Sequence, residues 1–79
     1  MTKYYTENRM MYFEVVEMEG ILGKGKYKID SFLHTNNGHY TIDRDMTEGV
    51  VLNSERKANI IAEGMSWAYN WGYEDGNKK

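Results

Sequence analysis

The chain has no cysteine among its 79 residues. This absence excludes disulfide scaffolds, zinc sites built on thiolates and catalysis by a thiol, and it is typical of a reducing compartment. The chain also has no apolar stretch near the roughly 18 residues that a membrane-spanning helix needs, and residues 1–10 contain no apolar run of the secretory type. We therefore expect a cytoplasmic protein that does not associate with membranes and is held together by packing alone.

A strong charge of either sign is also missing. Ten basic and twelve acidic residues leave a formal net charge of −2 and a pI near 5.6. A chain with this balance has no overall field that would attract nucleic acid or an anionic membrane. Only residues 21–45 carry more basic than acidic side chains, so any basic surface must be local to that segment.

What the chain does have is aromatic residues, with seven tyrosines and two tryptophans in a length that allows one small domain. We interpret residues 1–79 as a single domain with four parts. These are an N-terminal segment (1–8), an antiparallel sheet (10–52), a C-terminal helix (54–72) and a frayed tail (74–79).

Residues 10–18, MMYFEVVEM, alternate between two faces in the way of a half-buried strand. Met11, Phe13 and Val15 fall on the face predicted to be buried, and Tyr12 and Val16 fall on the other. The following Glu19-Gly20 predicts a turn, because glycine readily takes the positive φ that turns often require.

The strongest local signal is a hairpin formed by residues 26–35, Asn37-Gly38 and the run HYTIDR. Asn-Gly suits a two-residue type I′ loop, in which both central residues have positive φ. Such a loop would place Thr35 opposite Tyr40, Leu33 opposite Ile42 and Ser31 opposite Arg44. The face toward the helix would then collect Tyr27, Ile29, Leu33, Tyr40 and Ile42, and the open face would collect Lys24, Lys26, Lys28, Asp30, Phe32, His34, Thr41 and Asp43.

A helix is predicted from a cap at Asn53 or Ser54 to about Trp71, with Gly72 as a left-handed residue beyond its end. Its apolar positions form two stripes on a helical wheel. The stripe predicted to lie on the sheet contains Ala58, Ile61, Ala62, Met65, Ala68 and Tyr69. The second contains Ile60, Gly64, Trp67 and Trp71, and we expect the N-terminal segment with Tyr4 and Tyr5 to cover it.

These elements predict an α+β fold, an antiparallel sheet of three strands packed on one C-terminal helix in ββ(β)α order. Residues 50–52 form either a short fourth strand or a lead-in to the helix. The order resembles, in topology alone, small DNA-binding domains of integrases and plant transcription factors. The chain has no motif that defines such a family, and it lacks the excess of arginine and lysine that these domains use.

No constellation predicts catalysis, a metal or a cofactor. His34 and His39 are predicted to fall on the same sheet face, near one another diagonally across the hairpin, but a metal site needs three or four converging ligands and the chain has no third histidine. Asp43 and Asp45 have no enforced carboxylate partner in a closed cleft, and the serines have no evident base. We therefore expect a protein that is not an enzyme.

The leading hypothesis is a protein-interaction module, such as an adaptor or an inhibitor of a larger machine, that binds another protein. The short length and the asparagine- and tyrosine-rich composition suit a phage or mobile-element product. The partner surface is predicted to be the open sheet face or the tryptophan stripe, with the residues Tyr12, Val16, Lys24, Lys26, Lys28, Phe32, His34, Trp67 and Trp71.

Two alternatives remain open at this point. The lysines could contact nucleic acid, with Phe32 stacking on a base, although lysines on a strand also simply prevent edge-to-edge pairing of sheets. The chain could also be a homodimer, formed by pairing exposed strands or by burying Trp67 and Trp71 across a two-fold axis.

Overall fold

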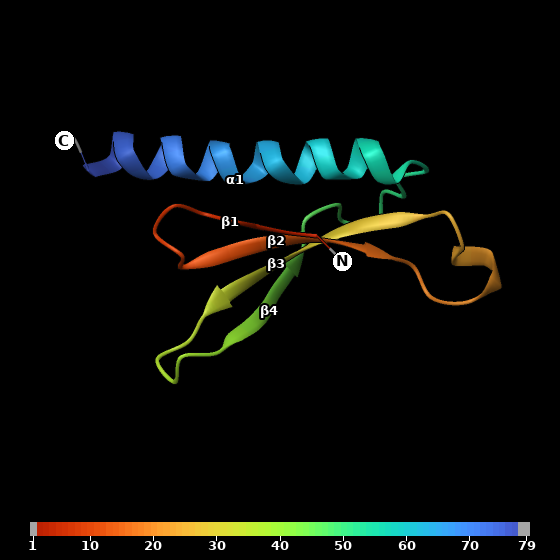
Figure 1. Ribbon diagram of the computed structural model, residues 1–79, viewed down its shortest axis with the longest axis horizontal. Helices are drawn as coiled ribbons and strands as arrows, with labels where there is room; N and C mark the ends of the chain where they lie inside the picture. The colour runs from red at the N-terminus through yellow and green to blue at the C-terminus, as the bar shows by residue number, and fades with distance from the viewer. Residues whose placement is uncertain (1, 78–79) are drawn as a thin grey trace.

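Four antiparallel strands form one sheet in the order β1-β2-β3-β4, and one helix lies along a single face of that sheet (Figure 1). The computed structural model describes residues 2–77, with side chains through residue 72. The elements are β1 (Lys3–Tyr5), β2 (Met11–Glu17), the 3₁₀ helix η1 (Ile21–Gly23), β3 (Tyr27–His34), β4 (Tyr40–Asp45) and α1 (Glu55–Asn77). The predicted α+β fold with a C-terminal helix is confirmed.

The fourth strand of the sheet is the N-terminal segment, which we had predicted to cover the helix. Strand β1 pairs with β2, and Tyr4 lies opposite Phe13. Residues 50–52 add only one bridge, in which the backbone groups of Tyr27 and Leu52 exchange hydrogen bonds of 2.7 and 3.0 Å. This segment is therefore a lead-in to the helix with a single anchoring contact.

The core lies between β2, β3 and the N-terminal half of α1. The predicted alternation of β2 is confirmed, because one face of the strand is buried against the helix. Ala58 and Ala62 on the helix are fully buried, and their small side chains let the helix backbone approach the sheet closely. The buried cluster consists of Met11, Phe13, Val15, Ile29, Ala58 and Ala62.

The hairpin between β3 and β4 has a loop one residue longer than predicted. Asn37 does not have positive φ, whereas Gly38 has a φ of 82°. Thr35 pairs with His39 instead of Tyr40, since its backbone N donates to the His39 carbonyl at 2.6 Å. This is a three-residue hairpin loop, in which a turn is followed by one residue with positive φ. A glycine at position 38 suits this loop as well as it suits the type I′ loop.

The longer loop shifts the register of the hairpin by one residue. Leu33 lies opposite Thr41, and Phe32 lies opposite Ile42. An irregularity between Ser31 and Phe32 then absorbs the extra residue, so that the predicted pair of Ser31 and Arg44 is confirmed.

The shifted register changes which side chains face the helix. The prediction that Leu33, Tyr40 and Ile42 all face the helix is therefore wrong for two of them. Tyr40 and Ile42 lie on the open face with Phe32. Leu33 stays on the helix side, but it is 41% exposed along a shallow apolar groove that it lines with Phe13 and Met65. Figure 1 shows the β3–β4 hairpin extending away from α1.

Helix α1 begins at the predicted cap but ends later than predicted. The Ser54 hydroxyl oxygen accepts a hydrogen bond from the backbone N of Lys57 at 3.2 Å, as expected for an N-cap. The helix continues through Gly72 to Asn77, and its last turns project beyond the sheet (Figure 1). An interior glycine weakens a helix by only about 1 kcal/mol, so Gly72 does not end it. Positions 74–77 of the predicted tail are helical, and 78–79 lie outside the described residues.

The buried face of α1 is rotated toward β1 compared with the prediction. Ile61 and Ala68, predicted to lie on the sheet, are exposed, whereas Ser66 is only 3% exposed. The Ser66 hydroxyl donates to the Glu63 carbonyl at 2.8 Å, which satisfies it in the core. The rotation follows from the fourth strand, because β1 brings Tyr4 under the helix, where its hydroxyl donates to Asn59 Oδ1 at 3.0 Å.

Candidate interaction surfaces

The outer stripe of α1, defined as Ile60, Gly64, Trp67 and Trp71, lies on the side of the helix away from the sheet. Its spacing of four, three and four residues places all four positions on one side of a helix that advances about 100° per residue. The buried positions 58, 62 and 66 fall on the opposite side. Ile60 is 60% exposed, Trp67 52% and Trp71 64%. The outer stripe is therefore a large apolar surface in contact with solvent.

The predicted cover of this stripe was wrong. Tyr4 lies in β1 on the sheet side of the helix, and Tyr5 lies on the open face of the sheet. Beyond β1, the backbone N of Glu7 donates to Asn70 Oδ1 at 2.9 Å, which holds the segment against the inner flank of α1. The N-terminal segment pairs with the sheet, so it does not cover the tryptophans, and both are exposed.

A helix whose only role is to cover a sheet would carry its largest apolar side chains on the sheet side. Helix α1 carries its tryptophans on the solvent side. Its buried positions include Ala58, Ala62 and Ser66, while its solvent-facing positions include two tryptophans. Burying a tryptophan removes up to about 250 Å² of surface from water, which is a large stabilisation that this fold does not use. The size pattern favours a second surface that covers the outer stripe.

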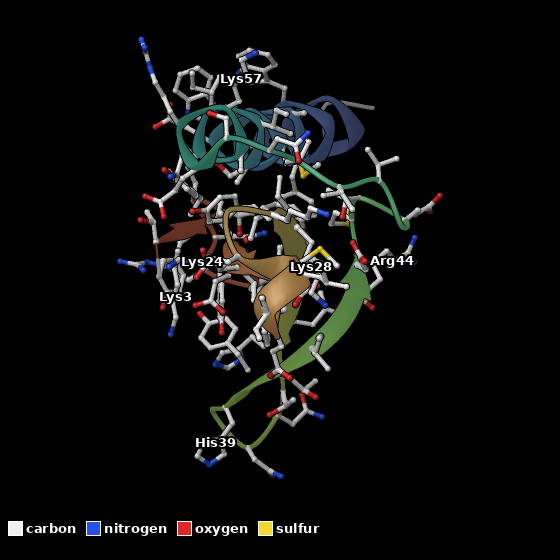
Figure 2. All side chains as sticks on the ribbon, turned by 90° about the vertical axis from the view of Figure 1, so that its right-hand side faces the viewer. Lys3, Lys24, Lys28, His39, Arg44 and Lys57 are labelled. Carbon is white, nitrogen blue, oxygen red and sulfur yellow. The ribbon has the colours of Figure 1, made fainter. Side chains whose placement is uncertain are left out.

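Basic side chains flank the N-terminal end of the outer stripe. Arg56 and Lys57 are exposed, and within residues 2–72 neither forms an ion pair. Figure 2 shows Lys57 on the side of α1 that points away from the sheet. The stripe therefore has positive charge beside its apolar surface at this end.

The open face of the sheet carries a cluster of rings, which we call the aromatic cluster. Tyr12 stacks on Phe32, with ring centroids 4.6 Å apart, and the edge of Tyr40 meets Tyr12 at 5.0 Å. The Tyr40 hydroxyl also donates to the Arg9 carbonyl at 2.6 Å, which ties the β1–β2 loop to the hairpin. The members of the cluster are Tyr5, Tyr12, Phe32, His34 and Tyr40.

The centre of the aromatic cluster is covered by its own rings. Tyr12 at its centre is only 6% exposed, and burial raises the pKa of its phenol, an effect that the nearby Lys3 ammonium partly opposes. Lys3 lies over the Tyr12 ring at 5.1 Å and Arg9 over the Tyr5 ring at 4.5 Å. The structure thus brings Tyr12, Phe32 and His34 together as predicted, and adds Tyr5 and Tyr40, which the sequence analysis did not include.

The predicted row of lysines does not form. Lys24 and Lys26 precede β3, on either side of Gly25, which has a φ of 77°. Lys28 is on the open face near Val16, and its Nζ lies 3.4 Å from Asp30 Oδ1, at ion-pair distance but without hydrogen-bond geometry. Asp30 in turn pairs in register with another acidic residue on each side, Glu14 and Asp45. The three lysines therefore do not form one row on the open face, which is the feature on which the nucleic-acid alternative depends.

The two histidines do not share a strand face. His34 belongs to the aromatic cluster, where it meets Tyr40 at 5.1 Å, whereas His39 lies in the loop at the tip of the hairpin (Figure 2). Within the described residues, no group of three or more histidine or acidic side chains is arranged to hold a metal ion.

Comparison of the chain with known protein families, curated proteins and solved structures finds no match. In the part of the chain that the structure describes, no helix combines the length and the apolar character needed to cross a bilayer. The candidate site is the outer stripe, on which three large apolar side chains of one helix face solvent together.

Proposed function

We propose that the chain is a small, non-enzymatic protein-interaction module, acting as an adaptor or as an inhibitor of a larger protein machine, and that it binds through the outer stripe of α1. The observation that carries the proposal is the exposure of Trp67 and Trp71, at 52% and 64%, on the side of the helix that points away from the sheet.

The physical support is the behaviour of tryptophan at interfaces. Tryptophan is enriched among the few residues that dominate binding free energies, because it removes a large apolar area from water while losing little side-chain entropy. Contiguous exposed apolar surface on a small protein is typical of an interaction site. The aromatic cluster supports binding less well, because its rings already pack on one another.

The test compares two variants as baits with the unmodified chain, in lysate of the native source. The first is Trp67→Ala/Trp71→Ala, which truncates the outer stripe. The second is Ile42→Ala, which truncates a side chain that is 58% exposed on the opposite face and serves as the matched control. We expect the control to retain the partners of the unmodified chain and the double variant to lose them. Retention of every partner by the double variant would contradict the proposal.

A direct readout on the purified chain complements the capture experiment. Trp67 and Trp71 are the only tryptophans of the chain, so its intrinsic tryptophan fluorescence reports on the outer stripe alone. We expect the emission of the isolated chain to be that of solvent-exposed indole, and to shift to shorter wavelength when a purified partner is added. An unchanged emission on complex formation would place the contact elsewhere.

A further inference from the structure

We infer that the outer stripe binds the same stripe of a second copy of this chain, with the two α1 helices antiparallel. This inference rests on the proposed use of the outer stripe as a binding surface, and it names a second copy of the chain as what that surface binds. The resulting dimer would have the two helices in the middle and one sheet on each outer side, since each sheet packs on the opposite side of its own helix (Figure 1).

The spacing of the outer stripe is that of a helix–helix seam. Positions 57, 60, 64, 67, 71 and 74 alternate steps of three and four residues, which is the period that keeps a narrow stripe facing a partner helix. A helix that covers a sheet does not need this second seam. Its presence on the far side of α1 favours a helix as the partner.

Gly64 indicates where the partner helix comes close. A Cβ at this position would meet nothing within 4 Å apart from the neighbouring backbone of the helix itself, so the packing of the monomer does not require glycine there. Consider a two-fold axis between positions 65 and 66, perpendicular to both helices. It would place Gly64 opposite Trp67 of the second copy and Ile60 opposite Trp71. Each tryptophan would then face a smaller side chain, as an interdigitated seam requires.

The charge pattern along α1 is complementary to itself in the antiparallel arrangement. The sequence has Arg56 and Lys57 before the outer stripe and Glu74 and Asp75 after it. Eighteen residues are about five helical turns, so position 74 returns to the side of position 56, and position 75 to that of position 57. The same two-fold axis sets each side of the helix against the same side of its partner. Basic positions of one copy therefore lie beside acidic positions of the other, at both ends.

A parallel pair would lose both kinds of complementarity. It would set basic positions beside basic ones and acidic beside acidic, and like charges at such distances repel. It would also set Gly64 against Gly64 and Trp67 against Trp67, leaving a gap beside a collision. The sequence of α1 therefore selects an antiparallel second copy.

The decisive experiment is a charge exchange measured by sedimentation equilibrium on the full chain. One variant is Arg56→Glu/Lys57→Glu and the other is Glu74→Lys/Asp75→Lys. Both exchanges place charges where the helix dipole favours them, so we expect each variant to keep its helix, as checked by circular dichroism. Each exposed ion pair contributes roughly a factor of two to three to association, so losing four of them weakens dimerisation on the order of 30-fold.

We expect the unmodified chain to dimerise in a concentration-dependent manner, each variant alone to be mostly monomeric, and an equimolar mixture of the two to regain the dimer. A chain that stays monomeric up to about 1 mM would overturn the inference. So would variants that dimerise as well as the unmodified chain, or a mixture that does not recover.

The Trp67→Ala/Trp71→Ala variant separates this inference from the proposed function. If the unmodified chain is monomeric but this variant loses its captured partners, the proposed function stands and self-pairing is refuted. If the charge exchange behaves as expected while capture is unaffected by the variant, self-pairing stands and binding of other proteins through the stripe is refuted.

Discussion

Replacing Gly64 by alanine tests the described packing of α1 most directly. Gly64 is well inside the helix, and an added Cβ would meet nothing within 4 Å, so the substitution introduces no clash in the monomer. Alanine exceeds glycine in helix propensity by about 1 kcal/mol, mainly because glycine loses more backbone entropy on folding. In a domain of this size, that gain raises Tm by about 4–8 °C.

The assay is thermal unfolding followed by circular dichroism, at a protein concentration low enough to keep the chain monomeric, because self-association would itself raise Tm. Gly72→Ala is the matched control: it is also helical, and a Cβ added there would meet no described side chain within 4 Å, but it lies off the outer stripe. We expect both variants to be more stable than the unmodified chain. Only Gly64→Ala should weaken dimerisation, because its methyl group would meet Trp67 of the second copy. A loss of stability in Gly64→Ala would refute the described packing of α1.

Three further predictions concern the fold. Ile29→Ala, at a fully buried position, should lower the free energy of unfolding by about 3 kcal/mol in urea titrations, a large part of what a small domain has. Ser54→Ala should lower it by about 1 kcal/mol, since the Lys57 backbone N loses its capping partner. The hydroxyl and backbone N–H of Thr47 lower the pKa of Asp45 below its ordinary 3.8, so the stability they confer is present above that pH and is lost as the pH falls through the lowered pKa. Thr47→Ala should therefore raise the Asp45 pKa in an NMR titration and destabilise the chain at neutral pH but not in strong acid.

The fold was predictable where a local pattern had one physical solution. The alternation of residues 11–16 places three apolar side chains on one face, and only burial against another layer satisfies that face. Ser54 was recognisable as a cap because its hydroxyl can accept a backbone hydrogen bond just before a helical pattern. These two signals were enough to predict a sheet with a helix on one side.

The register of the hairpin was not predictable from the turn residues. Asn37-Gly38 is compatible with a two-residue loop and with a three-residue loop, and the two differ by one residue in every pair up to the irregularity at Ser31. The side chains of Tyr40 and Ile42 do not decide between the two registers, because apolar neighbours are available to them on both faces of the sheet. Tyr40 reaches the open face, where Tyr12 and His34 receive it, and that contact forms only after folding.

The exposure of the tryptophans depended on a strand that leaves little trace in the sequence. Residues 3–5, KYY, are too short to show a period, so Tyr4 and Tyr5 were available in the prediction to cover Trp67 and Trp71. Pairing of β1 with β2 removes both tyrosines from that role. The exposure of the two tryptophans thus depends on the pairing of β1 with β2, and the sequence of α1 alone does not reveal it.

The two faces of the molecule differ in how far their large apolar side chains are packed against other side chains of the chain. On the open sheet face, rings pack on rings, and cations of the chain lie over two of them, so the centre of this face is already removed from water. On the outer face of α1, Ile60, Trp67 and Trp71 make no comparable cluster and remain more than half exposed. A helix that needed only to cover the sheet could carry polar residues at these positions without any loss of core packing. The monomer does not use the free energy available on burying them, which is the reason we propose an intermolecular contact there, and Gly64 leaves room for another helix at close range.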